Sequence, residues 1–99
     1  MKNKTYILGI GSQAKLLYNF IRYDKKSKYK VSGFVFVPDK FYKFRVPKKF
    51  CSLHVYKINQ IPKKSKIFLG IGDNILRGKI FSSLKNNFLF PNYVSSKSI

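Results

Sequence analysis

Two near-copies of one short sequence, LGIGSQ at residues 8–13 and LGIGDN at residues 69–74, indicate the fold of this 99-residue chain. Each overlaps the end of a short apolar run, Thr5–Ile10 or Ser65–Ile71. Runs of this kind form strands that are buried on both faces of a parallel sheet. Each also precedes a stretch in which apolar residues recur at helical spacing. We expect the strand that carries Ile67 and Leu69 to neighbour the strand that carries Ile7. The carboxyl ends of parallel strands lie at one sheet edge, so these neighbours would place both turns around a single crevice.

A third apolar run, Val31–Val37, completes a pattern of strands that alternate with helices. This pattern predicts a single α/β domain with an open, Rossmann-like parallel sheet and flanking helices. We expect Ser12 to cap the first helix, and Asp73 or Asn74 to cap the second. The residues expected to face the core are Ala14, Leu17, Tyr18 and Ile21 in the first helix and Leu76, Ile80, Phe81 and Leu84 in the second.

The stretch Lys40–Pro62 is less regular and rich in lysine. We interpret it as a long connection that holds a short strand near Leu53–Tyr56 and one helical turn. Asn86 and Asn87 are expected to end the second helix, and Asn92–Val94 to form a last short strand. No apolar run approaches the roughly 18 residues that span a bilayer, so we expect a soluble, cytoplasmic protein.

The composition restricts the chemistry that the chain supports. Hydrophobic residues make up 44% of the chain, which suits one buried core. The only acids are Asp24, Asp39 and Asp73, and the only histidine and cysteine are His54 and Cys51. These residues provide little material for a metal cluster, a carboxylate pair or a catalytic triad. We expect His54 to be an ordinary strand residue and Cys51 to be a small, half-buried residue rather than a nucleophile.

The excess of basic residues has two explanations. Lysine and arginine number 21, and the formal net charge is +18 at pH 7. Genome composition explains much of the lysine content, because the chain is also rich in Asn, Ile, Phe and Tyr, whose codons are likewise rich in A and T. The alternative is a polyanionic partner such as nucleic acid or an anionic surface. If genome composition is the main cause, we expect nucleic-acid binding to be weak and non-specific. Four aromatic residues interleaved with lysines resemble a stacking surface for single strands, although packing of a long loop is the commoner cause: Phe41, Tyr42, Phe44 and Phe50.

The first glycine turn carries a phosphate-binding pattern. Gly9, Gly11 and Ala14 match the spacing G-x-G-x-x-G/A, in which glycine lets backbone N–H groups approach a phosphate at a helix N-terminus. The steric needs of a tight strand-to-helix turn are the alternative reason for these glycines. The repetition of the turn favours a phosphate-bearing ligand. The residues predicted to bind it are Gly9, Gly11, Ser12 and Gln13 from the first turn and Gly72, Asp73, Asn74 and Arg77 from the second.

Each of the residues other than glycine has an expected role. The backbone N–H groups of Ser12 and Gln13 would donate to a diphosphate, and Arg77 would supply positive charge through its planar fork. Asn74 would order the second turn, whereas Asp73 would cap the second helix or face a sugar.

The end of the second predicted strand disfavours NAD as the ligand. A dinucleotide enzyme places an acid there to hold a ribose. This chain has Phe36 and Val37 at that position, with Asp39 beyond a proline. The pattern is compatible with a mononucleotide or a nucleotide-sugar that is held mainly by its diphosphate.

The order of these segments resembles the N-terminal domain of the PglD/NeuD-like sugar acyltransferases. The matching pieces are TYILGIGSQAK (5–15), KVSGFVF (30–36), SLHVYKINQIP (52–62), IFLGIGDNILRGKIFSSL (67–84) and FPNYVSSKSI (90–99). The most specific part is the second glycine turn followed by Arg77. The chain departs from the family pattern at Ser12 and Gln13, where a Gly-His pair is usual, and at Phe36 and Val37, where aspartates are usual.

The resemblance implies that residues 1–99 form a domain that binds a UDP-linked amino sugar. Enzymes of this family acetylate the sugar with acetyl-CoA in glycan biosynthesis, and a C-terminal left-handed β-helix carries their CoA site and catalytic histidine. The chain stops at Ile99, where that β-helix would begin, so we expect a monomeric binding domain without catalysis or cofactor of its own. The alternatives are a basic module that binds nucleic acid or another polyanion on the same fold, and a fold remnant that serves only in protein association.

Overall fold

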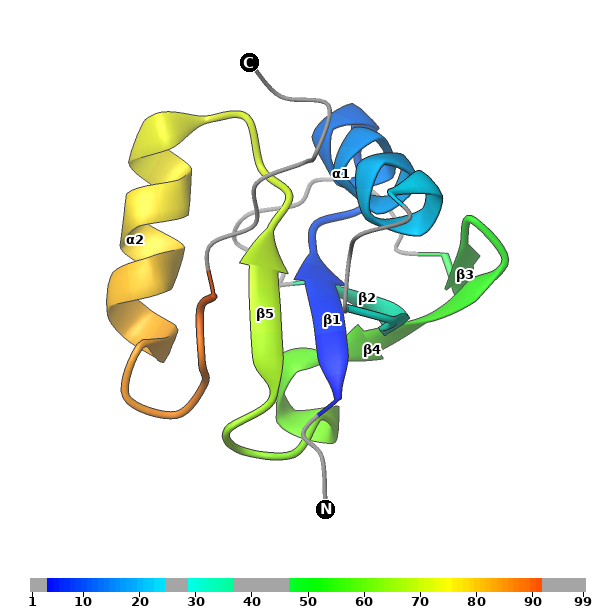
Figure 1. Ribbon diagram of the computed structural model, residues 1–99. Coiled ribbons are helices and arrows are strands. Elements are labelled where there is room, and N and C mark those ends of the chain that lie inside the picture. Colours follow the sequence, from blue (N-terminus) through cyan, green and yellow to red (C-terminus); the bar gives the residue numbers. More distant parts are fainter. Residues whose placement is uncertain (1–3, 25–28, 37–46, 92–99) are drawn as a thin grey trace.

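The computed structural model describes residues 4–24, 29–36 and 47–91. Its sheet consists of β1 (Thr5–Leu8), β2 (Val31–Phe36), β3 (Lys49–Phe50), β4 (Leu53–Lys57) and β5 (Lys66–Leu69), and β1 lies between β2 and β5. Their order in the sheet is β3-β4-β2-β1-β5, and every pair is parallel except β3 with β4 (Figure 1). The predicted parallel sheet is confirmed, and so is the prediction that β5 neighbours β1, because Ile7 pairs with Phe68.

Two helices cover opposite faces of this sheet (Figure 1). They are α1 (Ser12–Tyr23) and α2 (Asn74–Leu84). Successive residues of a strand point to opposite faces, so Tyr6 and Ile7 belong to different halves of the core. Ile21 of α1 packs in the half that contains Ile7, and Ile80 of α2 packs in the half that contains Tyr6. The result is an α/β fold whose central strands are buried on both faces.

Both helices begin where the sequence predicts, but their caps differ. The prediction that Ser12 caps α1 is wrong, because Gly11 is the N-cap residue and no side chain caps this helix. Asp73 caps α2 as predicted: its Oδ1 accepts hydrogen bonds from the N–H groups of Ile75 and Leu76 at 2.9 and 3.0 Å. A cap of this kind contributes about 1 kcal/mol to stability.

The predicted core face of α2 is only partly right. Ile80 is 1% exposed, and Leu76 and Leu84 are half-buried against the same half of the core. Phe81 is 41% exposed, so its assignment to the core is wrong. Consecutive helical residues lie about 100° apart around the axis, which turns Phe81 away from the sheet to meet the ring of Phe90, with centroids 5.1 Å apart.

A β-hairpin that the sequence analysis missed joins β3 to β4. Phe50 pairs with Leu53 across a two-residue turn, in which Cys51 and Ser52 have positive φ angles of 51° and 67°. Such turns are usually built from Asn and Gly, so this sequence carries no turn signal. The ring of Phe50 packs on Phe34 with centroids 4.9 Å apart, which makes Phe50 a core residue rather than part of a stacking surface. The other members of that predicted surface, Phe41, Tyr42 and Phe44, lie outside the described residues.

The remaining boundaries shift by a few residues. β4 and the 3-10 helix η2 (Ile58–Gln60) confirm the predicted short strand and helical turn. Helix α2 ends at Leu84, earlier than predicted, and Leu89 then forms a parallel bridge with Lys66. The predicted strand Asn92–Val94 lies outside the described residues, as does Val37. In the described parts of the chain, no helix is long and apolar enough to span a bilayer.

Candidate functional site

The carboxyl ends of β1 and β5 lie side by side at the point where the strand order reverses. The chain places β2 and β4 on one side of β1 and β5 on the other. Helices α1 and α2 then leave these two strand ends toward opposite faces of the sheet. Such a divergence opens a crevice at the carboxyl edge, which is where open α/β sheets bind their ligands. Both glycine turns border this crevice.

The four turn glycines differ in what surrounds them. A Cβ atom added to Gly9, whose φ is +120°, would lie 2.6 Å from the carbonyl oxygen of Gly70. A Cβ on Gly70 would lie 2.7 Å from the Cα of Ala14. Packing alone therefore requires glycine at these two positions. In contrast, a Cβ on Gly11 would meet nothing within 4 Å, so the space on the side where a side chain would project is open there.

A pocket of about 330 Å³ lies between the two turns. Its lining consists of both turns and one residue of α2: Gly9, Ile10, Gly11, Ser12, Gln13, Gly70, Ile71, Gly72 and Leu76. The structure thus brings together all the predicted site residues of the first turn with Gly72 of the second. Ser12 and Gln13 are exposed at the start of α1, which has no side-chain cap and no acid in its first turn. Their N–H groups are therefore not engaged by a capping side chain and favour an anion.

The start of α2 is a poorer anion site. The carboxylate of Asp73 already accepts two of its N–H groups and adds negative charge there. Asp73 and Asn74 do not line the pocket between the turns. The Oδ1 of Asn74 instead accepts a hydrogen bond of 2.6 Å from Nη2 of Arg77, so Asn74 orients this arginine.

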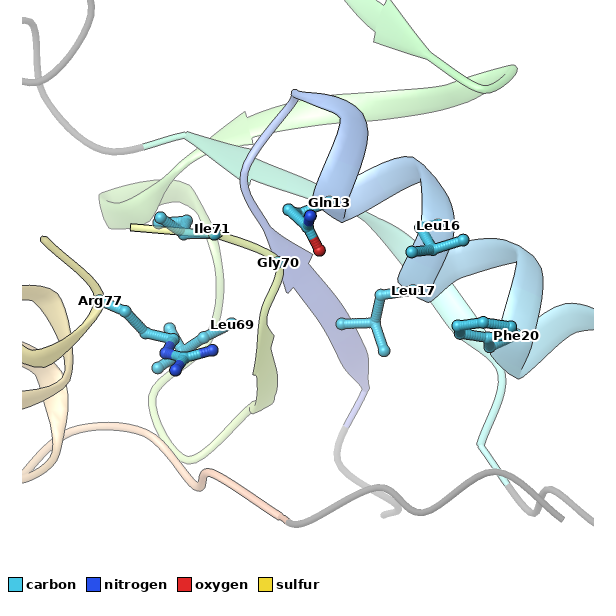
Figure 2. A pocket seen from close by; sticks show the side chains of 9 residues that line it. Gln13, Leu16, Leu17, Phe20, Leu69, Gly70, Ile71 and Arg77 are labelled. Carbon is cyan, nitrogen blue, oxygen red and sulfur yellow. The ribbon is translucent and has the colours of Figure 1, made fainter. Parts of the chain in front are cut away.

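Arg77 lines a second pocket, of about 310 Å³, that adjoins the first. The two pockets share Gln13, Gly70, Ile71 and Gly72 and so form one groove. A Cβ on Gly72 would lie 3.0 Å from the Cγ of Gln13, which places the Gln13 side chain at the junction. Figure 2 shows Leu16, Leu17 and Phe20 of α1 on one side of the second pocket, and Leu69 and Arg77 on the other. A guanidinium has five N–H donors, so the bond to Asn74 leaves others for a ligand.

The apolar wall of the second pocket was missed by the sequence analysis. Leu16 and Phe20 are 48% and 46% exposed and lie four residues apart on α1. They lie outside the face of α1 that was predicted to pack in the core. Two apolar residues four positions apart on the opposite, exposed face are the signal that could have identified them. A third pocket continues the groove past Leu17 and Arg77 toward Phe81 and Phe90.

Comparison with known proteins yields no match: no family model, no curated protein and no solved structure matches this chain. The chemistry of the groove must therefore be interpreted from its own residues. It offers backbone N–H groups and an open glycine at one end, a guanidinium farther along, and apolar side chains on the wall beyond. This arrangement suits a ligand that is anionic in one part and flat or apolar in another.

Proposed function

We propose that this chain binds a nucleotide-linked sugar of the UDP-amino-sugar class, with its diphosphate between the two glycine turns of a Rossmann-like domain. The domain would hold the substrate of a sugar acetyltransferase-like protein and would not itself catalyse the transfer. The observation that carries the proposal is the pocket between the turns, where Gly11 is exposed and has open space on the side of its missing Cβ.

The charges along the groove support an anionic ligand. The first turn of α1 contributes a partial positive charge and the N–H groups of Ser12 and Gln13. Arg77 contributes a full charge from the other wall of the groove, held by Asn74. A diphosphate has two anionic centres and matches a site with donors on two sides better than a single phosphate does.

The dimensions and walls of the groove support a ligand larger than a phosphate. Its two adjoining pockets, of about 330 and 310 Å³, are each at the lower end of the range of about 300–1,000 Å³ that ligand sites occupy. Leu16, Leu17 and Phe20 form an apolar wall beside Arg77, against which a sugar or base ring can pack. Phe36 at the end of β2 provides no carboxylate for a ribose, which again disfavours NAD.

Calorimetric titration with UDP, UDP-sugars and NAD tests the proposal. The wild type should bind UDP-sugars more tightly than NAD. Arg77→Ala should weaken the binding of UDP-sugars roughly ten- to a hundredfold, because a charge-assisted hydrogen bond contributes about 1.5–3 kcal/mol. Arg22→Ala is the matched control: its guanidinium lies over the ring of Tyr23, 5.3 Å from the centroid, and outside the groove. This control substitution should change the affinity for UDP-sugars by no more than about twofold, because solvent and salt screen distant charges.

Two results would count against this function. No binding of UDP or UDP-sugars by the wild type at millimolar ligand would refute it. Equal losses in Arg77→Ala and Arg22→Ala would show that net charge, and not the groove, attracts the ligand.

A further inference from the structure

We propose that a row of lysines along the amino edge of the sheet forms a second binding surface, which takes the phosphate backbone of a nucleic acid. This amino-edge row consists of Lys4, Lys30, Lys63, Lys64, Lys66 and Lys85. It lies at the end of the strands opposite to the ligand groove and is independent of it.

The strand register aligns the first part of the row. Thr5 pairs with Val31 on one side and with Lys66 on the other. Lys4 and Lys30 directly precede two of these paired residues, so three lysines start three neighbouring strands. The N–H of Lys66 donates to the carbonyl oxygen of Lys4 at 2.9 Å. Neighbouring strands are about 4.8 Å apart, so the three lysine backbones follow one another in a line across the sheet.

Two hydrogen-bonded connections extend the row toward α2. Lys63 and Lys64 lie in the loop that precedes β5, and the N–H of Lys64 donates to the carbonyl oxygen of Asn87 at 2.6 Å. Asn87 comes two residues after Lys85, the C-cap residue of α2. The amino-edge row therefore runs from the start of β2 to the C-terminus of α2.

The lysines of this row outnumber the acids in the described parts of the chain. Five of its lysines are exposed, and Lys66 is half-buried with its Nζ 5.6 Å from the ring centroid of Tyr29. The described parts of the chain contain two acids: Asp73 lies at the opposite, carboxyl edge, and Asp24 is only 8% exposed. With two acids in those parts of the chain against six lysines, the row keeps a net positive charge.

The backbone at Lys64 indicates that its charge has a use. Its φ is +67°, in the left-handed region that is strained for a residue with a Cβ. Glycine has no such cost, and asparagine, whose codons are as A-rich as those of lysine, tolerates this region well. Genome composition therefore explains a lysine here less well than it does on an ordinary surface. A strained residue that persists is a reason to expect a function.

The shape of the row favours a nucleic acid over a membrane. A row of lysines along a sheet edge complements a linear chain of phosphates, whose bound counterions are released as each lysine binds. Membrane binding by a basic surface is strengthened by an apolar face that enters the bilayer, and Leu89, which is 45% exposed and forms a bridge with Lys66, adds one apolar side chain to six charged ones. All six members of the row are lysines, and none is an arginine. We therefore expect recognition of the phosphate backbone without base specificity.

Fluorescence anisotropy with a labelled single-stranded homothymidine oligonucleotide tests the row in the full chain. The double variant Lys63→Gln/Lys64→Gly removes two charges from the row. The control Lys48→Gln/Lys49→Gln removes two from exposed positions at β3, on the far side of the sheet. With a salt slope of about −0.7 per phosphate contact on a single strand, the first variant should bind roughly 60-fold more weakly at 50 mM salt. Its salt slope should also fall by about 1.4, whereas the control should keep the wild-type slope.

A thermal melt separates this effect from misfolding. Lys64→Gly alone relieves the strained backbone, so its Tm should not fall although its affinity for the oligonucleotide does. The proposal is overturned if the wild type does not bind the oligonucleotide at 50 mM salt, or if the row and control variants lose affinity equally. It is also overturned if anionic phosphatidylserine vesicles bind the chain more tightly than the oligonucleotide does.

Discussion

Alanine substitutions of Gly9 and Gly11 should separate the folding role of the first turn from its ligand role. The two residues lie two positions apart in one phosphate-binding pattern, which gives no reason to expect different effects on stability. Their surroundings do differ: Gly9 has a φ of +120° and would direct a Cβ atom to 2.6 Å from the carbonyl oxygen of Gly70. Gly11 has extended backbone angles of −108° and −166° and open space around it.

These geometries give the expected magnitudes. A backbone conformation that suits only glycine costs about 1–3 kcal/mol, and a forced contact in a packed region costs about 1–3 kcal/mol more. Gly9→Ala should therefore lower the free energy of unfolding by about 2–6 kcal/mol. The total stability of a domain of this length is about 5–15 kcal/mol, so the loss is large. Gly11→Ala should change stability by less than about 1 kcal/mol, since the lower entropy of the unfolded chain offsets a slightly poorer N-cap.

Urea denaturation followed by circular dichroism measures both values. Gly70→Ala serves as a second positive control, because its Cβ would lie 2.7 Å from the Cα of Ala14. The reasoning is refuted if Gly11→Ala destabilises the chain as much as Gly9→Ala, or if Gly9→Ala is neutral. Titration of the stable Gly11→Ala variant with UDP-sugars then reports the ligand role alone, and we expect at least a tenfold weaker affinity from the added methyl group at the phosphate.

Three further predictions concern stability. Asp73→Ala should lower the free energy of unfolding by about 1 kcal/mol in urea, because two N–H groups of α2 lose their acceptor. Ser52→Gly should raise it by about 0.5–1 kcal/mol, since relief of the left-handed backbone at φ 67° exceeds the entropy cost of glycine. Burial, and secondarily the charge of Tyr56, raise the pKa of Tyr6 above 10.0. The contribution of Tyr6 to the free energy of unfolding is therefore complete below pH 10 and is lost as the pH rises through the folded-state pKa. In a series of melts at increasing pH, Tyr6→Phe should reduce this loss of stability at alkaline pH.

The sequence alone was sufficient for three of the parallel strands, β1, β2 and β5. The apolar runs at β1, β2 and β5 are continuous because these strands are buried on both faces, and such runs are visible without a structure. The repeated glycine turn located both helix starts to within a residue. It also identified the first-turn residues and Gly72, which now line one pocket.

The hairpin and the groove walls could not be predicted in this way. The β3–β4 turn contains Cys51 and Ser52 instead of the residues that favour positive φ, so its local signal is absent. Leu16 and Phe20 line the groove because β5 lies beside β1 and brings Arg77 to the other wall. The repeated turn predicted that these strands are neighbours, but no local pattern shows which side chains of α1 and α2 face each other across the groove.

The division between the two sources of information has a physical basis. Helix starts and the cap at Asp73 arise from interactions between residues close in sequence, and burial on both faces leaves a continuous apolar run in each central strand, so the sequence by itself determined these features. The roles of Gly9, Gly11 and Gly70 depend on atoms about 60 residues away or on their absence, and only the tertiary structure distinguishes a glycine that packing requires from one that leaves its backbone open. The amino-edge row is of the same kind: its lysines are scattered along the chain, and the strand register and two loop hydrogen bonds align them.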